Sequence, residues 1–128
     1  MSLDRSSAVV LLVDDDPLVL DVVQSSLEDA GFTVSPAATG EAAMTALENR
    51  RARDLDALVT DVNLGARMSG WRIATRAREL KPGLPVVYVS GDSAHDWNAH
   101  GVPKSLFVQK PFVPAQIVTA LARLLEDA

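Results

Sequence analysis

The sequence predicts an α/β fold in which short parallel strands alternate with helices that cover both faces of a single sheet. Five short apolar runs alternate with stretches in which apolar residues recur at helical spacing, and such strand–helix units build a parallel sheet. The run at residues 9–13 is apolar at every position, as in a strand buried on both faces. With 128 residues and 48% hydrophobic composition, the chain suits one domain with a sizeable core.

The strands are expected at the apolar runs, which Gly, Pro and polar residues separate from the rest of the chain. Residues 85–89 form the fourth run, which is again expected to be buried. The segment 92–100 that follows it carries only a weak pattern. The five expected strands are residues 9–13, 32–34, 55–60, 85–89 and 106–108.

The helices are expected where apolar side chains recur every three or four residues. Their starts carry residues that cap a helix through a side-chain oxygen, or a proline that suits the first turn. Gly31 closes the first helix, an arginine-rich run at 50–53 follows the second, and a Lys-Pro-Gly sequence breaks the third. The expected helices start at Pro17 (after Asp16), after Thr39, after Ser69 and at Pro114, and they end near Gly31, Arg50, Leu80 and Glu126.

Composition and charge argue against several classes of function. A net charge of −5 disfavours nonspecific binding to nucleic acid or to an anionic membrane. The absence of cysteine excludes disulfides, a thiolate nucleophile and a zinc–thiolate site. No apolar run approaches the roughly 20 residues of a membrane span, and residues 1–7 show no signal peptide. We therefore expect a cytoplasmic protein that contacts neither nucleic acid nor membrane.

Three consecutive carboxylates, Asp14, Asp15 and Asp16, follow the first strand. Two carboxylates about 4 Å apart repel each other by roughly 4 kcal/mol at an effective dielectric constant near 20. An accumulation of acids at one strand end therefore suggests a bound cation, and oxygen ligands suggest a hard one such as Mg²⁺. The alternative is a solvated acidic turn. For Asp14 and Asp15 this motif alone leaves both interpretations open, whereas Asp16 is expected to cap the first helix.

Polar groups end four of the five strands. Because the carboxyl ends of parallel strands share one edge of the sheet, these groups are expected to converge. Carboxylates, a hydroxyl and an ammonium in one pocket suit phosphoryl chemistry, in which cations neutralise phosphoryl oxygens and a carboxylate is the nucleophile. Singly, the hydroxyl could belong to a turn and the ammonium to the surface, but their joint position favours a site. The converging residues are Asp14, Asp15, Asp61, Ser90 and Lys110.

The sequence around these residues resembles the receiver domain of bacterial two-component response regulators. The resemblance covers nearly the whole chain in the family's order, and it implies one flavodoxin-like (βα)5 domain. This is a three-layer sandwich with a parallel sheet of order 2-1-3-4-5. It implies a receiver domain over residues 1–128, with a core at about 8–127, and we expect no output domain. The motifs are LVDDD at 12–16, VTDVN at 59–63, VSG at 89–91 and QKPF at 109–112.

The resemblance also implies roles for the site residues. Asp61 would be phosphorylated by a histidine kinase or a histidine phosphotransfer protein, in a reaction that requires Mg²⁺ or Mn²⁺. Ser90 and Lys110 would contact the phosphoryl group. Phe107 stands at the position of the family's aromatic switch residue and would act together with Ser90. The metal ligands would be Asp15, Asp61, the main-chain carbonyl of Asn63 and, through water, Asp14.

Further features follow from the same resemblance. The Lys110–Pro111 peptide bond would be cis. Residues 64–68 replace a proline that receivers usually carry, which predicts a longer and looser loop. The fourth helix, after Ser90, is expected to be short or irregular. The residues flanking the phosphoryl site are Asn63, Gly91 and Asp92, and the Asn–Asp pair is typical of receivers that lose phosphate quickly.

Three functional interpretations remain open. A phosphorylatable receiver is a phosphoacceptor that assists its own phosphorylation and dephosphorylation and is not otherwise an enzyme. It would act in a phosphorelay through a downstream protein partner, as a monomer or a weak phosphorylation-dependent dimer. The first alternative is a haloacid dehalogenase-like phosphatase, because residues 14–16 also fit an Asp-x-Asp nucleophile motif. The second is a pseudo-receiver that binds partners without being phosphorylated.

Overall fold

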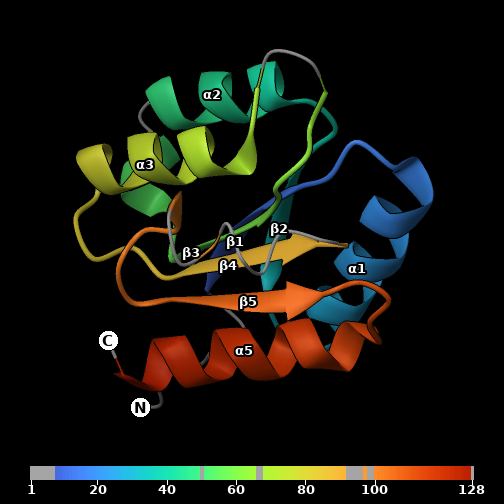
Figure 1. Ribbon diagram of the computed structural model, residues 1–128. Coiled ribbons are helices and arrows are strands. Elements are labelled where there is room, and N and C mark those ends of the chain that lie inside the picture. Colours follow the sequence, from blue (N-terminus) through green and yellow to red (C-terminus); the bar gives the residue numbers. More distant parts are fainter. Residues whose placement is uncertain (1–7, 50, 66–67, 92–96, 98–99, 128) are drawn as a thin grey trace.

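The protein folds as an α/β sandwich around one parallel sheet (Figure 1). The computed structural model describes residues 8–49, 51–65, 68–91, 97 and 100–127. The strands are β1 Val9–Val13, β2 Thr33–Ala37, β3 Ala57–Asp61, β4 Val86–Ser90 and β5 Ser105–Gln109. The helices are α1 Pro17–Asp29, α2 Gly40–Glu48, α3 Gly70–Leu80 and α5 Pro114–Asp127, with a 3-10 turn, η2, at Arg51–Asp54.

The strand order is β2-β1-β3-β4-β5, and every neighbouring pair is parallel, which confirms the predicted topology. Helices α2 and α3 cover one face of the sheet, whereas α1 and α5 cover the other (Figure 1). Among the helices of the described residues, none has both the length and the apolar character that a membrane crossing requires. The parallel arrangement places the carboxyl ends of all five strands at one edge of the sheet.

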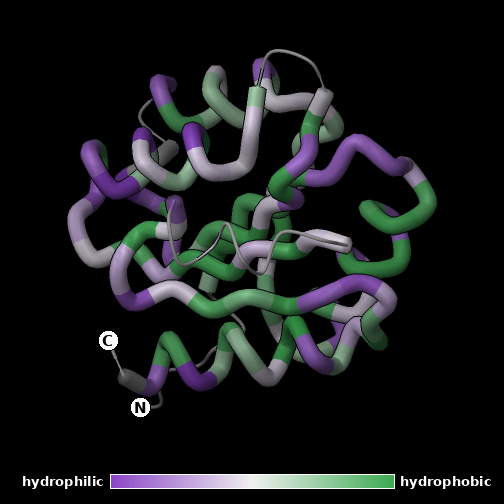
Figure 2. Tube along the Cα trace, viewed as in Figure 1, coloured by the Kyte–Doolittle hydropathy of each residue, from purple (hydrophilic) through white to green (hydrophobic). Residues whose placement is uncertain are grey.

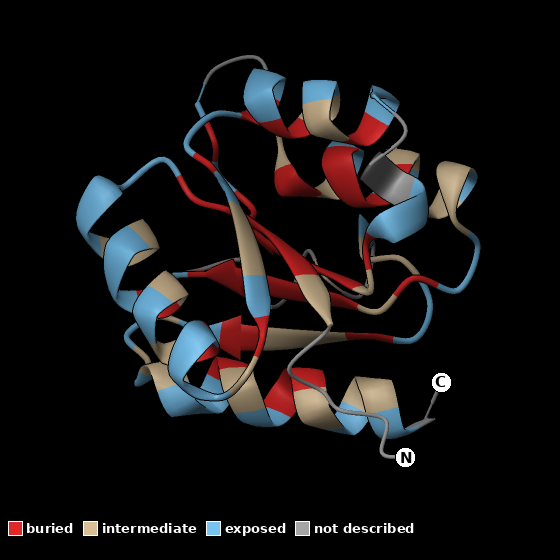
Figure 3. Cartoon of the chain, turned by 180° about the vertical axis from the view of Figure 1, so that it is seen from behind, coloured by how far each residue is buried: buried red, intermediate tan, exposed pale blue. Residues whose placement is uncertain are grey.

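The sheet separates two apolar cores, and each strand supplies both. In β1, Leu11 and Val13 belong to the core under α2 and α3, while Val10 and Leu12 belong to the core under α1 and α5. All five residues of β3 and all five of β4 are buried (Figure 3). The continuous apolar runs of the sequence therefore correspond to strands covered on both faces, and the central strands are correspondingly hydrophobic in Figure 2.

The predicted helix caps are present at three helix starts. The Asp16 carboxylate accepts hydrogen bonds from the main-chain N–H groups of Leu18 and Val19. Thr39 and Ser69 accept in the same way at α2 and α3, from two residues within the first turn. Each such cap contributes about 1 kcal/mol to stability, because it satisfies an N–H group that the helix itself leaves without a partner.

Several predicted boundaries were wrong. Strand β2 extends from Thr33 to Ala37 instead of ending at residue 34, and it includes Pro36. It tolerates this proline because β2 is an edge strand that pairs only with β1. Strand β3 begins later than predicted and includes Asp61 as its last residue. Of the segment expected to hold a short or irregular fourth helix, residues 92–96 and 98–99 lie outside the described residues.

The connection between β3 and α3 is anchored at both ends. Asn63 and Ser69 form an antiparallel bridge, and Leu64 is buried, while residues 66–67 of the loop expected to be longer and looser lie outside the described residues. Gly70, which starts α3, donates its main-chain N–H to the carbonyl of Val62 at 2.8 Å. A Cβ atom on Gly70 would lie 2.2 Å from the carbonyl oxygen of Asp61. The start of α3 therefore packs directly on the main chain of the strand end that carries Asp61.

We expect Gly70→Ala to destabilise the protein by about 1–3 kcal/mol, because main-chain atoms of Asp61 and Val62 cannot move aside as a flexible side chain would. Gly91→Ala is the matched control, since a Cβ there meets nothing within 4 Å, and its effect should stay within about 0.5 kcal/mol. Urea unfolding measures both. Equal stabilities for the two variants would contradict the close packing at Gly70.

Candidate functional site

The candidate site lies at the carboxyl edge of the sheet, where the structure brings together the predicted polar residues. Asp14 and Asp15 follow β1, and Asp61 ends β3. One carboxylate oxygen of each of these three residues lies within 4.8 Å of the others. Ser90 ends β4 and is fully buried, and its carbonyl accepts the main-chain N–H of Lys110 at 2.8 Å. Parallel strand pairing thus places all five residues at neighbouring strand ends.

Asp61 is held between a main-chain donor and an ammonium. Only 5% of the residue is exposed. One carboxylate oxygen, Oδ1, accepts the main-chain N–H of Asn63 at 3.2 Å, and the other, Oδ2, lies 3.2 Å from Nζ of Lys110. The same Nζ lies 3.9 Å from a carboxylate oxygen of Asp14. Lys110 is therefore shared between the two buried acids.

The electrostatics of the site follow from burial. Burial raises the pKa of the Asp14 carboxyl to about 6, and the nearby charge of Asp61 acts in the same direction. The hydrogen bond from the main-chain N–H of Asp16 lowers that pKa, but it does not offset the loss of water. For Lys110, burial lowers the pKa of the ammonium, but the charges of Asp61 and Asp14 outweigh this effect and leave it raised.

The donor set fits a hard divalent cation. The carboxylates of the two buried acids and the exposed Asp15 surround one common position, and Asp15 is the member of this cluster that solvent contacts. With all three ionised, the single ammonium of Lys110 leaves an excess of negative charge among these four groups. The three carboxylates supply only oxygen atoms, which are the ligands that Mg²⁺ and Mn²⁺ prefer.

The structure describes most, but not all, of the remaining residues of the predicted site. Asn63 and Gly91 are exposed at the rim, next to Asp61 and Ser90 in the chain. Asp92 lies outside the described residues. Phe107 is half-buried in β5, directly opposite Tyr88 of β4, and its ring packs against that of Trp97. The Lys110–Pro111 peptide bond is cis, the conformation that the resemblance to receivers implies.

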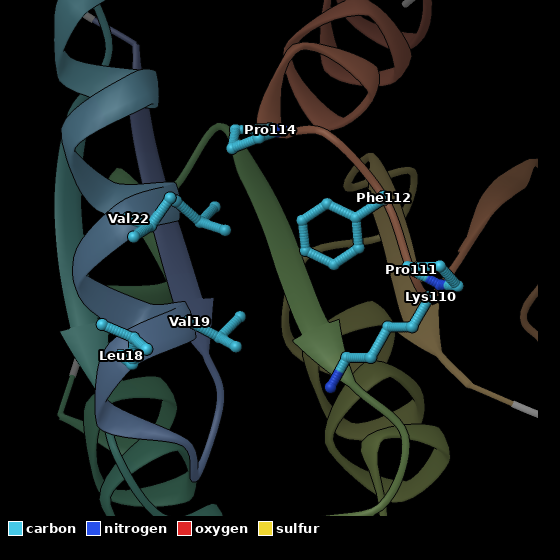
Figure 4. Close-up of a pocket in the computed structure, with 8 residues that line it drawn as sticks. Leu18, Val19, Val22, Lys110, Pro111, Phe112 and Pro114 are labelled. Atoms are coloured by element: carbon cyan, nitrogen blue, oxygen red, sulfur yellow. The ribbon is translucent and has the colours of Figure 1, made fainter.

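An apolar groove beside the site was not predicted. It has a volume of about 560 Å³ and lies between α1 and the segment that joins β5 to α5 (Figure 4). Leu18 is 71% exposed on α1, and Val113, between the lining residues Phe112 and Pro114 in the chain, is 61% exposed. Figure 4 shows the Lys110 side chain extending from the groove wall toward the end of β3. The lining residues are Leu18, Val19, Val22, Val23, Lys110, Pro111, Phe112 and Pro114.

The sequence held a signal for this groove. Leu18 and Val22 share one side of α1 with a spacing of four residues, which is also the spacing of core residues. The distinguishing feature is Val113, which follows Lys110-Pro111-Phe112 in a segment without strand or helix periodicity. An apolar residue that fits neither strand nor helix periodicity has no expected place in the core, so such a residue indicates an exposed apolar surface.

Comparison with known proteins identifies similar chains. Residues 10–122 match the family model described as the response regulator receiver domain. The regulatory protein PrrA of Mycobacterium tuberculosis is 35% identical over 123 residues, and the probable transcriptional regulatory protein TcrX of the same species is 32% identical over 124. These matches cover 94% and 95% of this chain but 51% of each relative, so the chain spans about half the length of these curated relatives.

Solved structures show the same similarity. A response regulator receiver protein from Sinorhizobium medicae superposes with a TM-score of 0.89 at 39% identity, covering 94% of this chain and 95% of that one. The chemotaxis response regulator CheY4 of Vibrio cholerae has a TM-score of 0.79 at 27% identity, covering 91% and 98%. The fold is therefore shared along nearly the whole of these structures.

We expect Asp14→Asn to stabilise the metal-free protein at pH 7.5. The folded state binds the Asp14 proton more tightly than the unfolded state does, since the pKa is about 6 against 3.8. The contribution of the Asp14 carboxyl to the free energy of unfolding is therefore highest below pH 4 and falls as the pH rises from about 4 to 6. At neutral pH this contribution is about 3 kcal/mol lower than it is below pH 4. An asparagine at this position cannot ionise, so the cost of burying a charge is removed. Its side-chain oxygen can still accept the hydrogen bond from the main-chain N–H of Asp16.

Thermal melting in EDTA from pH 4 to 8 measures the effect. The melting temperature of Asp14→Asn should exceed that of the wild type by several degrees at pH 7.5, and the difference should shrink toward pH 4. Asp15→Asn is the matched control, because this exposed carboxylate keeps its water and should change stability less. A lower melting temperature for Asp14→Asn at pH 7.5 would contradict the proposed electrostatic cost.

Proposed function

The chain belongs to the family of response regulator receiver domains, and we propose that it accepts a phosphoryl group on Asp61 from a histidine kinase or histidine phosphotransfer protein. The observation that carries this proposal is the position of Asp61. Its carboxylate ends a buried strand within reach of two further acids, and the ammonium of Lys110 lies 3.2 Å from one of its oxygens. A carboxylate beside cations is the arrangement that a phosphoryl acceptor requires.

In the proposed reaction, one oxygen of the Asp61 carboxylate forms a bond to phosphorus. The bond between phosphorus and the donor nitrogen breaks, and its electron pair leaves with the donor imidazole. The product is an acyl phosphate. Lys110 stays close enough to neutralise one phosphoryl oxygen, and the Ser90 hydroxyl at the end of β4 is proposed to donate to another.

A bound Mg²⁺ or Mn²⁺ would supply the remaining positive charge for the phosphoryl oxygens. We propose that Asp15, Asp61 and the main-chain carbonyl of Asn63 hold the ion directly, with Asp14 acting through water. The clustering of the Asp14, Asp15 and Asp61 carboxylates supports these three residues as members of the ligand set. Hydrolysis reverses the modification when water attacks the phosphorus, and the exposed rim residues Asn63 and Gly91, together with Asp92, are proposed to influence its rate.

The apolar groove is proposed as the surface that receives the protein donor. A donor histidine must bring its phosphoryl group to Asp61, and Lys110 both lines the groove and contacts Asp61. Apolar side chains from the helices of a donor would cover Leu18 and Val113, which water now contacts. On phosphorylation, Ser90 and Phe107 are proposed to rearrange and alter the surface presented to a downstream protein partner.

The proposal also covers the partners, the cellular location and the oligomeric state of this chain. The names of the relatives describe transcriptional regulators, and they apply to proteins about twice as long. For this chain, a net charge of −5 supports an action through proteins in the cytoplasm, without nucleic-acid or membrane binding. We propose a monomer or a weak phosphorylation-dependent dimer. The family assignment favours a receiver over a haloacid dehalogenase-like phosphatase. Phosphorylation of Asp61 is the property that would distinguish an active receiver from a pseudo-receiver.

We expect the wild type to gain one phosphoryl group when it is incubated with acetyl phosphate and Mg²⁺, and Asp61→Asn to gain none. Intact-mass spectrometry measures the gain, and borohydride trapping followed by peptide mapping places it on a carboxylate. Asp21→Asn is the control, because Asp21 is exposed on α1 outside the acid cluster and should leave the gain unchanged. One phosphoryl group on Asp61→Asn would refute the assignment.

The groove predicts a difference between protein donors and small donors. Leu18→Ser should slow phosphotransfer from a purified, autophosphorylated histidine kinase about fivefold or more, since truncating an important contact residue costs about 1 kcal/mol or more. Phosphorylation by acetyl phosphate should keep its wild-type rate, because a small donor does not need the groove. Thr45→Ser, a change on α2 away from the groove, should alter neither rate. Equal slowing of Leu18→Ser with both donors would contradict a docking role.

A further inference from the structure

The proposed switch residue Phe107 lies in a cluster of aromatic rings on the side of the sheet that α3 covers. Its ring centroid is 5.9 Å from that of Trp97, and the ring planes are inclined by 34°. Tyr88, its neighbour on β4, is fully buried and packs against Trp71 with 4.6 Å between ring centroids. Any movement of Phe107 therefore changes the packing of the indole of Trp97.

The indole of Trp97 is fixed by a short series of hydrogen bonds. Its Nε1–H donates to Oγ of Ser105 at 3.0 Å, and the Ser105 hydroxyl donates to the carbonyl of Val102 at 2.7 Å. The main-chain N–H of Val102 donates to the hydroxyl of Tyr88 at 3.1 Å. Both main-chain polar groups of Val102 are thus bound by side chains of β4 and β5, and Trp97 is attached to the same network.

The main chain of Gly101 also packs closely against the indole. The N–H of Gly101 donates to the carbonyl of Trp97 at 2.9 Å. A Cβ atom on Gly101 would lie only 2.3 Å from Cδ1 of the indole ring. The indole ring of Trp97 therefore packs directly against the main chain of Gly101, and the same ring contacts Phe107. The indole cannot move away without losing either this packing or the hydrogen bond to Ser105.

We propose that Trp97 is a positioning residue that holds Phe107 in its unphosphorylated position, and that the hold is released when phosphorylation of Asp61 moves Phe107. This inference rests on the proposed function, because it concerns the switch of the same site. A contact present in only one of two states favours that state, and a ligand that selects the other state must overcome it. Loosening the hold should therefore strengthen the binding of an activating ligand.

A purely structural role predicts something different. If the network only stabilises the segment around residues 100–105, its loss lowers the stability of both states equally. The affinity for an activating ligand is then unchanged, because that affinity depends only on the difference between the two states. Stability and ligand affinity, measured together, separate the two roles.

The first measurement is the affinity for beryllium fluoride in the presence of Mg²⁺, determined by calorimetry. Ser105→Ala removes the acceptor of the indole N–H and should bind about 2- to 10-fold more tightly than the wild type, the factor that one neutral hydrogen bond supports. Its melting temperature should fall. Thr75→Ala is the matched control, since it also loses a hydroxyl hydrogen bond, to the carbonyl of Trp71, without touching Phe107. Its affinity should be unchanged.

The second measurement reads Trp97 directly. The chain has two tryptophans, so Trp71→Phe leaves Trp97 as the single indole. Its emission should change on adding beryllium fluoride with Mg²⁺, because the packing of Phe107 on the ring is lost. This measurement does not need Ser105→Ala, and it decides the inference if that variant does not fold.

The outcomes separate the inference from the proposed function. If Asp61 is phosphorylated, but Ser105→Ala binds no more tightly and Trp97 emission stays constant, Trp97 does not hold the switch, and the proposed function stands. If mass spectrometry finds no phosphoryl group on Asp61 of the wild type, the proposed function fails, and the inference fails with it. Tighter binding together with changed emission supports both.

Discussion

Two buried carboxylates at neighbouring strand ends, Asp14 and Asp61, determine the electrostatics of the candidate site. Asp14 and Asp61 are 4% and 5% exposed because β1 and β3 lie in the middle of a sheet covered on both faces. They share one ammonium, that of Lys110, and burial raises the pKa of Asp14 to about 6. The folded state therefore carries an unfavourable charge arrangement that a bound cation relieves. A ligand that relieves it binds the folded state alone and stabilises the fold.

The surrounding main chain keeps this arrangement in place. Asp61 pairs with Val89 of β4, and Thr60 before it pairs with Val13 of β1, so the main chain of Asp61 is fixed by the centre of the sheet. Gly70 packs on the carbonyl of Asp61, and the bridge between Asn63 and Ser69 closes the loop beside it. The described ends of the β3–α3 connection are therefore fixed on either side of residues 66–67. The main-chain contacts on both sides of Asp61 therefore fix where its carboxylate lies.

The sequence predicted the topology and the polar strand ends because both follow from local patterns. Apolar runs such as residues 9–13 fix which segments are buried, and parallel pairing then brings Asp14, Asp61 and Lys110 to one edge. Boundaries such as that of β2 were wrong, because an edge strand accepts Pro36, and edge position is a property of the whole sheet. The groove was missed because spacing alone does not distinguish an exposed apolar residue from a core residue.

The two surfaces connected to the site lie on opposite faces of the sheet. Phe112 and the groove belong with the core under α1 and α5, whereas Phe107 and Trp97 pack against the core under α2 and α3. A sheet buried on both faces is too well packed to transmit a graded deformation between them. A direct connection exists at the strand ends, where the N–H of Lys110 donates to the carbonyl of Ser90 and its ammonium lies 3.2 Å from Asp61. Lys110 lines the groove, contacts Asp61 and binds the end of β4, so the proposed phosphorylation of Asp61 would change the charge beside a residue that adjoins both the groove and β4.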